Sequence, residues 1–154
     1  MRVVIQRVSE ASVTVEDRIT GQIGAGLLVL AGFAPTDDTT TLDWIARKLV
    51  QLRIFSDDEG KMNRSVQDVG GQVLVVSQFT LLADARKGNR PSYVGAAPPP
   101  LAIPLYEQFV QILEKLLGQP VATGEFGADM KVRLLNDGPV TIVLDSPGSE
   151  RVNG

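Results

Sequence analysis

The first third of the chain carries the alternation of apolar and polar residues that is typical of β-strands. Residues 3–8 are mainly apolar, and residues 11–16 alternate strictly, so that every second side chain faces the same apolar side. Residues 26–33 are apolar almost without interruption, as in a strand that is buried on both faces. Gly21 and Gly24 precede the third run, so the pattern predicts a series of strands joined by short turns.

Two later segments change to the three- and four-residue spacing of amphipathic helices. The first has candidate N-cap residues at positions 36–41 and places five apolar residues in one stripe: Leu42, Ile45, Ala46, Leu49 and Leu52. The second is predicted to begin near Pro104, because proline suits the first helical turn, and to end at Gly118. Its inward-facing residues are predicted to be Leu105, Phe109, Ile112, Leu113 and Leu116.

The remaining apolar runs predict further strands around these helices. Residues 53–56 form a short strand, residues 73–81 are the most strand-like segment, and two final strands are expected at 131–135 and 140–145. Because the strands arrive in runs and do not alternate strictly with helices, we expect a single α+β domain. It has a largely antiparallel, barrel-like sheet core with the two long helices on one face.

The domain is expected to span residues 1–145, followed by a polar and frayed tail at residues 146–154. The longest apolar run near a terminus, residues 26–32, is too short to cross a bilayer. The first seven residues have the pattern of a strand and not that of a signal peptide. We therefore expect a cytoplasmic protein with no membrane association.

Histidine and cysteine are absent from the 154 residues, and this absence restricts the chemistry more than the net charge of −3 does. Zinc, haem and iron–sulfur sites need these side chains, and so do Ser–His and Cys–His nucleophiles. The acidic run at 57–59 lacks the spacing of a calcium loop. The chemistry that remains possible uses carboxylates, lysine-assisted nucleophiles, oxygen-ligated Mg²⁺ or Ca²⁺, or main-chain electrostatics. The alternative is a protein that catalyses no reaction. We expect neither a bound metal nor a cofactor.

A polar group follows the most strand-like run, in the segment Ser77-Gln-Phe-Thr-Leu81. Main-chain N–H groups at such a strand exit can be left unpaired and point at a ligand, which is the geometry of an oxyanion hole. Ser77 and Thr80 also supply hydroxyl groups. The alternative, which the spacing alone favours, is that these are ordinary polar positions at a half-exposed strand end, with Phe79 packed beneath.

A second candidate is the segment Asn136-Asp-Gly-Pro-Val-Thr141, between the last two predicted strands. Asp-Gly is a strong signal for a tight hairpin turn, and the residues alone favour that interpretation. A Gly-Pro bond is also one of the few peptide bonds that can be cis at modest cost, about 0.5–1 kcal/mol. In that case Gly138 and Pro139 would present a rigid wall of carbonyls without side chains.

The polar loop at residues 83–100 contains three basic residues, Arg86, Lys87 and Arg90. Loops of this length within a compact domain are more often functional than idle. Charged loop residues are usually only solvated, but near a binding site they would hold a phosphodiester end. The net charge of −3 argues against broad nucleic-acid binding and is compatible with a small basic patch around one RNA end.

Together, the two motifs at 77–81 and 136–141 closely resemble the signature motifs of the D-aminoacyl-tRNA deacylases, formerly called D-Tyr-tRNA(Tyr) deacylases. Either motif alone is a weak signal, whereas both in order in a chain of this length are a strong one. The resemblance covers residues 1–145. It continues, in family order, through Gln6–Val8, Ala11–Val15, Gly21–Leu30, Arg53–Ser56, Gly60–Asn63, Arg90–Pro91 and Ala128–Met130.

The resemblance implies a homodimeric enzyme that hydrolyses the ester between a D-amino acid and the 3′-terminal adenosine of tRNA. It also implies that the bond between Gly138 and Pro139 is cis and enters the active site of the partner subunit. There the two residues form a chiral filter, in which their carbonyls hold the α-amino group and leave no room for an L side chain. Such a filter does not exclude glycine, so mischarged glycyl-tRNA is an expected second substrate.

The same resemblance assigns the catalytic residues to the strand exit. Ser77, Gln78, Phe79 and Thr80 are expected to line the ester, with the main-chain N–H groups of Phe79 and Thr80 as oxyanion donors. Phe126 and Met130 match the positions that hold the terminal adenine, and stacking a base on an aromatic ring contributes about 1–3 kcal/mol. Arg7 and Asn136 are expected to assist substrate binding.

Two mechanisms are open for such a site. In one, Thr80 is a covalent nucleophile, which needs a base, and only a lysine or a carboxylate such as Asp137 could serve. In the other, the protein positions the ester and stabilises the oxyanion, while the ribose 2′-OH or a water that it orients does the proton transfer. We favour the second.

Two other functions are compatible with such a chain. One is a non-catalytic nucleic-acid-binding module on the same fold. The other is a sister type of deacylase that acts on achiral or L-aminoacyl-tRNA. Phe79 and the Asn-Asp-Gly-Pro run match the D-specific type.

Overall fold

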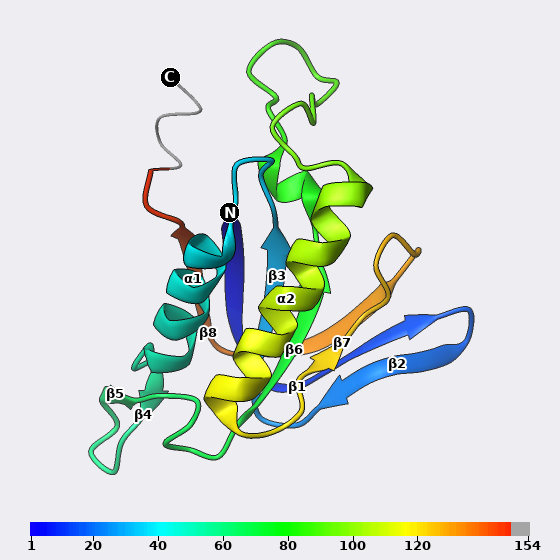
Figure 1. Cartoon of the computed structure of the whole chain (residues 1–154). Coiled ribbons are helices and arrows are strands. Elements are labelled where there is room, and N and C mark those ends of the chain that lie inside the picture. The colour runs from blue at the N-terminus through cyan, green and yellow to red at the C-terminus, as the bar shows by residue number, and fades with distance from the viewer. Residues whose placement is uncertain (149–154) are drawn as a thin grey trace.

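A six-stranded sheet forms the centre of the computed structural model, which describes residues 1–148 (Figure 1). Its strands are β1 (Arg2–Val15), β2 (Arg18–Ile23), β3 (Gly26–Gly32), β6 (Gln72–Ser77), β7 (Ala122–Thr123) and β8 (Lys131–Asp145). One edge of β1 pairs with β8, and the other edge pairs first with β3 and then with β2. These three pairings are antiparallel, whereas β3–β6 and β6–β7 are parallel, so the sheet is mixed.

The sheet curls until β2 approaches β7 and nearly closes a barrel. A Cβ atom on Gly21 would lie 2.4 Å from the main-chain oxygen of Thr123, so only glycine permits this approach. The strict alternation at residues 11–16 turns apolar side chains to the inside of the curl. There they belong to a cluster of buried residues: Val8, Ala11, Val13, Val15, Ile23, Leu28, Leu74 and Val76. The prediction of a single α+β domain with a barrel-like core is confirmed.

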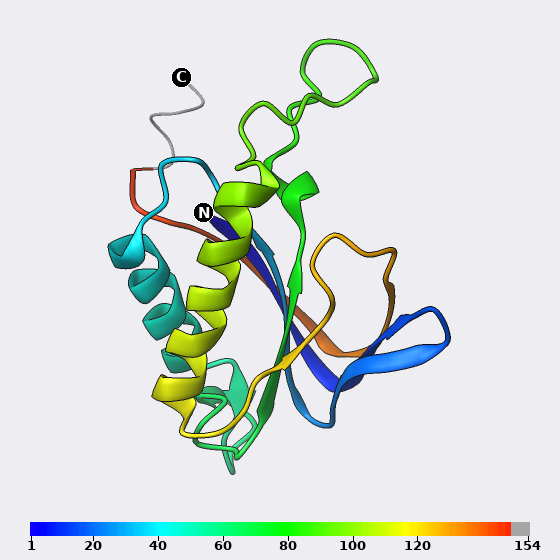
Figure 2. The ribbon, with the colours of Figure 1, turned by 45° about the vertical axis from the view of Figure 1, so that its right-hand side comes forward.

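The helices α1 (Thr39–Gln51) and α2 (Pro99–Leu117) lie side by side on one face of the sheet, as predicted (Figures 1 and 2). Asp38 caps α1, because its carboxylate accepts a hydrogen bond of 3.0 Å from the N–H of Thr41. Buried residues of both helices join those of β1 and β3 in a second, larger core cluster. Its helical members are Leu42, Ile45, Ala46, Leu49, Val50, Ala102, Tyr106, Phe109 and Leu113.

The start of α2 differs from the prediction. The helix begins at Pro99 and includes Pro104, which was expected near its start. The three consecutive prolines at 98–100 can occupy the cap and the first turn, because N–H groups there need no intrahelical acceptor. The predicted end is confirmed, since Gly118 adopts a left-handed conformation with φ 68°.

The strand predicted at 73–81 ends early. β6 stops at Ser77, and residues Phe79–Leu82 form the short 3₁₀ helix η1. Its parallel neighbour β3 ends at the same level, where the N–H of Gln78 donates to the carbonyl of Ala31 at 2.8 Å. Beyond that bond the chain has no strand to pair with, so it turns.

The hairpin interpretation of residues 136–141 is wrong. The segments predicted as two strands form the single strand β8, and both parts pair with β1 and not with each other. The register shifts where Gln6 pairs with Thr141 and Val8 pairs with Asn136, so that residues 137–140 bulge opposite Arg7. The bond between Gly138 and Pro139 in this bulge is cis. The long-range pairing with β1 has overridden the local turn signal.

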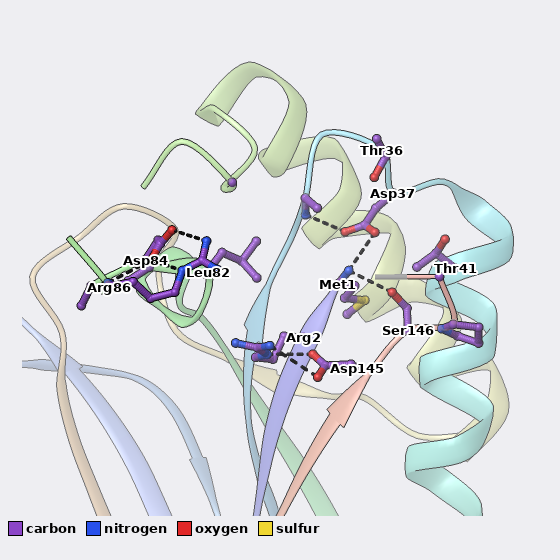
Figure 3. Close-up of a pocket in the computed structure, with 16 residues that line it drawn as sticks. Met1, Arg2, Thr36, Asp37, Thr41, Leu82, Asp84, Arg86, Asp145 and Ser146 are labelled. Atoms are coloured by element: carbon purple, nitrogen blue, oxygen red, sulfur yellow. Dashed lines mark hydrogen bonds and ion pairs between the residues drawn. The ribbon is translucent and has the colours of Figure 1, made fainter. Parts of the chain in front are cut away.

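Ser146, the first residue of the predicted tail, contacts the N-terminus. Ser146 is buried, its N–H donates to the carbonyl of Met1 at 3.0 Å, and its hydroxyl accepts from the Met1 α-ammonium at 3.0 Å (Figure 3). The rest of the predicted tail, from residue 149 onward, lies outside the described residues. A small hairpin of β4 (Phe55–Ser56) and β5 (Met62–Arg64) completes the fold. Neither helix in the described part of the chain has the length and apolarity that a membrane span requires.

Candidate active site

A pocket of about 270 Å³ opens where the parallel strands β3 and β6 end. Its walls come from the two strand ends, from η1, from the start of α2 and from the segment between β7 and β8. The lining residues are Ala31, Phe33, Val76, Ser77, Gln78, Phe79, Ala97, Ala102, Phe126, Gly127, Ala128, Met130 and Val132. None of them has an ionisable side chain. Within its own chain, this pocket therefore offers main-chain groups, hydroxyls and amides for a reaction, and no acid or base.

The strand exit supplies the polar groups of this pocket. Ser77 and Gln78 are half-buried, and the side-chain amide of Gln78 donates a short hydrogen bond to the hydroxyl of Thr80. The N–H of Gln78 donates to the carbonyl of Ala31, and the N–H of Leu81 donates to the carbonyl of Gln78. Within residues 1–148, the N–H groups of Phe79 and Thr80 have no acceptor. They are the first two donors of η1 and are free to bind an oxyanion.

Gly32 sets the position of this turn. A Cβ atom at residue 32 would lie 2.9 Å from the carbonyl oxygen of Gln78 and 3.3 Å from the Cβ of Leu81. Arg2 holds the other end of the turn, because its guanidinium donates to the carbonyl of Leu81 at 3.1 Å while it pairs with Asp145 at 2.7 Å. The turn is therefore fixed at both ends by β3 and β1.

Aromatic side chains form the apolar part of the pocket. Phe126 lies 5.7 Å from Tyr106 between ring centroids, and Tyr106 lies 6.4 Å from Phe33. The hydroxyl of Tyr106 donates to the carbonyl of Val75 at 3.3 Å, and burial raises the pKa of Tyr106 to about 12. Tyr106 therefore stays protonated and supports the pocket without entering acid–base chemistry. Tyr106 lies within the predicted helix, but the inward-facing stripe was assigned to its neighbour Leu105, and so Tyr106 was missed.

The bulge of β8 lies elsewhere on the molecule. Asn136, Asp137, Gly138 and Pro139 are all exposed. The guanidinium of Arg7 donates to the carbonyl of Asp137 at 2.9 Å and to the carbonyl of Ile54 at 2.7 Å, which ties the bulge to the segment between α1 and β4.

The structure does not bring this bulge to the pocket of its own chain. Across the sheet, Ser77 of β6 pairs with Ala31 of β3, and Ala31 pairs with Val3 of β1. The bulge of β8 lies on the other edge of β1, opposite Arg7. Three strand spacings and four residues separate them, which corresponds to roughly 20 Å. Of the predicted site residues, Ser77, Gln78, Phe79, Phe126 and Met130 therefore share one pocket, and Thr80 lies in the adjoining turn. Arg7, Asn136, Gly138 and Pro139 form a separate group.

A larger pocket of about 400 Å³ is lined by the N-terminus, the segment that leads into α1, residues 82–86 and residues 145–148 (Figure 3). Its charged groups are already paired with one another. Asp37 binds the Met1 α-ammonium at 2.9 Å, and Arg86 binds Asp84 at 2.7 Å. The hydrogen bonds from Arg86 lower the pKa of Asp84 to about 2. We regard this pocket as structural, because its polar groups satisfy each other and none of the predicted site residues lines it.

A sequence model of the family described as D-Tyr-tRNA(Tyr) deacylase matches residues 4–145. The chain belongs to this family. Two relatives, both named D-aminoacyl-tRNA deacylase, come from Chlorobaculum parvum and Flavobacterium johnsoniae. The first is 59% identical over 96% of this chain and 99% of the relative, and the second is 59% identical over 97% and 100%. As a member of the D-Tyr-tRNA(Tyr) deacylase family, the chain is a hydrolase.

Two solved structures resemble this member of the deacylase family. One is described as c-Myc DNA Unwinding Element Binding Protein, with a TM-score of 0.90 and 42% identity over 96% of this chain and all of that chain (100%). The other is described as a probable eukaryotic D-amino acid tRNA deacylase, with a TM-score of 0.79 and 20% identity over 93% and 97%. The second likeness shows the shared fold.

Proposed function

We propose that the chain hydrolyses the ester between a D-amino acid and the 3′-terminal adenosine of tRNA in the cytoplasm, as a proofreading enzyme of translation. The observation that carries this proposal is the pocket at the end of β6, where two free main-chain N–H groups adjoin an aromatic wall. An ester is already activated, so positioning and an oxyanion hole can account for its cleavage. Family membership supports the choice of an aminoacyl-tRNA as the substrate.

The terminal adenosine is proposed to occupy the apolar part of this pocket. Phe126 offers an aromatic face and Met130 a polarisable side chain on the same wall. Met130 packs tightly there, because a Cβ on Gly124 would lie 2.6 Å from its sulfur. With the base on this wall, the ester is placed near Ser77 and Gln78, and its carbonyl oxygen near the N–H groups of Phe79 and Thr80.

The proton transfer is proposed to come from the RNA. The hydroxyl of Thr80 accepts a hydrogen bond from Gln78, and no lysine or carboxylate lines the pocket to act as its base. The neighbouring ribose 2′-OH, or a water that it orients, is the remaining candidate. Asp137, the one carboxylate in the motifs, would approach the pocket only with the β8 bulge of a partner chain, and in each chain its carboxylate already lies 3.9 Å from Arg7.

The chiral filter is proposed to come from a second copy of the chain. Gly138 and Pro139 are exposed and lie roughly 20 Å from the pocket of their own chain, by the strand spacings above. They can therefore line a pocket only in a partner. Within the described residues, β8 pairs with β1 alone, and it exposes Leu135 and Val143 by 55% and 60%. A long edge strand with exposed apolar side chains is a surface that a second chain can cover.

Substrate choice follows from this filter. Carbonyls of Gly138 and Pro139 from the partner would hold the α-amino group, and the main chain beside them would collide with an L side chain. Rejection by collision can exceed the 1–3 kcal/mol or so that a missing apolar contact gives. A hydrogen atom in place of a side chain does not collide, so glycyl-tRNA is proposed as a further substrate.

The test is hydrolysis of D-Tyr-tRNA and L-Tyr-tRNA under identical conditions. We expect rapid hydrolysis of the D form and none of the L form above the spontaneous rate. A Phe126→Ala variant purified in the same way checks for contaminating deacylases. Its loss of base stacking should lower kcat/KM by about fivefold or more, whereas a contaminant would give the same rate in both preparations. Equal rates on both forms would contradict the filter and favour the sister type of deacylase.

A second candidate is a non-catalytic nucleic-acid-binding module. The observation in its favour is the description of a 42% identical structure as a DNA-unwinding-element-binding protein. The net charge of −3 argues against broad phosphate binding. Tight binding of duplex DNA by this chain, together with no hydrolysis of D-Tyr-tRNA, would favour the module over the enzyme.

A further inference from the structure

The rings of Phe79 and Tyr93 form an exposed aromatic pair at the pocket, and the site described so far uses only the main chain of Phe79 for chemistry. Phe79 lines the pocket, and the ring of Tyr93 lies 5.0 Å from it between centroids in an edge-to-face arrangement. The two residues are 54% and 41% exposed. Aromatic rings are usually buried, and two that remain exposed at the mouth of a pocket offer faces on which planar groups can stack.

The position of Tyr93 is fixed by the base of the 83–98 loop. The main chains of Asp84 and Ser92 exchange two hydrogen bonds, both of 2.8 Å, and Tyr93 follows directly. This closure holds Tyr93 over Phe79 while the tip of the loop extends beyond the sheet and the start of α2 (Figures 1 and 2). The aromatic pair is therefore a fixed surface and not a chance contact of a loose loop.

The same loop carries positive charge toward solvent. Arg86 is neutralised by Asp84, whereas Lys87 and Arg90 are exposed and have no ion pair within residues 1–148. The chain as a whole has a net charge of −3, but these two unpaired cations make the surface beside the aromatic pair locally positive. Stacking faces next to cations are the features by which proteins bind unpaired nucleotides.

We propose that Phe79 and Tyr93, with Lys87 and Arg90, form a subsite for the single-stranded nucleotides that precede the terminal adenosine. The inference rests on the proposed function, which places that adenosine in the adjoining pocket. In tRNA these nucleotides are two cytidines. A pyrimidine base would stack on the exposed pair, and the loop cations would contact the phosphates. The subsite would add affinity for the RNA end without contributing to the chemistry.

The experiment compares two substrates that differ only in this part. One is 3′-D-tyrosyl-adenosine, and the other is the trinucleotide CCA carrying D-tyrosine on its 3′ end. We expect wild-type kcat/KM to be at least about fivefold higher for the trinucleotide, from one stacked base. Tyr93→Ala should abolish most of this preference and leave the rate on the adenosine substrate within about twofold, whereas Tyr93→Phe should keep the preference.

Two further variants separate stacking from charge and from loop structure. Val94→Ala, at a neighbouring residue that is 89% exposed, is the matched control and should behave as wild type. Lys87→Ala combined with Arg90→Ala should flatten the salt dependence of kcat/KM for the trinucleotide, since each phosphate contact on a single strand contributes a slope of about −0.7.

The outcomes distinguish the subsite from the proposed function. If the wild type cleaves neither substrate nor D-Tyr-tRNA, the proposed function fails and the subsite with it. If the wild type cleaves both substrates equally well, the subsite is overturned and the function stands. If Tyr93→Ala lowers both rates to the same extent, Tyr93 only supports Phe79, and the subsite is overturned as well.

Discussion

Replacing Gly32 by alanine tests whether the main chain of η1 is part of the catalytic apparatus. The new Cβ would lie 2.9 Å from the carbonyl oxygen of Gln78. That is about 0.4 Å closer than the shortest ordinary C–H···O contact of about 3.3 Å, so β3 and the turn must move apart by at least this amount. The carbonyl oxygen of Gln78 is main chain, and the Cβ of Leu81 at 3.3 Å is bonded directly to the main chain, so neither atom can rotate away.

The expected consequences of this displacement can be bounded. Overpacking of this kind costs about 1–3 kcal/mol of folding free energy. A misplacement of about 1 Å costs an enzyme about 100-fold in rate, so a displacement of about 0.4 Å should lower kcat by roughly tenfold. KM should change little, because the adenine wall at Phe126 is attached to different elements.

The assay is steady-state hydrolysis of D-Tyr-tRNA, accompanied by urea unfolding. Gly24→Ala is the matched control, because the nearest atom to its Cβ is a flexible side-chain oxygen at 3.8 Å. If Gly32→Ala keeps wild-type kcat while it is destabilised as expected, the N–H groups of η1 are not the oxyanion donors.

Three further outcomes follow from the site. Thr80→Ala should retain activity within about tenfold of wild type in the same assay, because Thr80 lacks a base; a loss comparable to general-base removal, about 100-fold or more, would favour a nucleophile. Tyr106→Phe should lower the free energy of unfolding by about 1 kcal/mol in urea, since the hydrogen bond to Val75 is lost, and should leave kcat unchanged. Because its pKa is lowered to about 2, Asp84 keeps its interaction with Arg86 above pH 4 and loses it as the pH falls toward 2. The amide resonance of Arg86 should report this transition, and a midpoint near 4 would contradict the bidentate pairing.

The local sequence pattern was sufficient to predict the elements whose buried residues recur at a regular spacing. The alternation at residues 11–16 and the stripe of α1 both face the core as predicted, because burial on one face imposes that period. The end of β6 could not be predicted in this way. Phe79 and Leu81 look like strand residues, and the turn at Ser77 is imposed by where the neighbouring strand β3 stops.

The last third contains two errors. The Asp-Gly signal at 137–138 favours a hairpin locally, but pairing of the whole segment with β1 satisfies more main-chain groups. Pro104 was interpreted as a helix start, although three prolines at 98–100 offered an earlier one. Tyr106 was left out of the predicted core for another reason, because the inward stripe was assigned to Leu105. The pocket residues Phe126 and Met130 were found by resemblance alone, since nothing in their own pattern distinguishes them.

The central claim is that the pocket supplies no ionisable group, so that the RNA provides the reactive hydroxyl. The most direct test is single-turnover hydrolysis, at saturating enzyme, of D-Tyr-tRNA whose terminal adenosine lacks the 2′-OH and carries the ester on the 3′ oxygen. Loss of a positioned proton-transfer group costs about 10²–10⁴-fold, and we predict a loss in this range with unchanged binding. Hydrolysis of the 2′-deoxy substrate at the normal rate would contradict the account and assign the proton transfer to the protein.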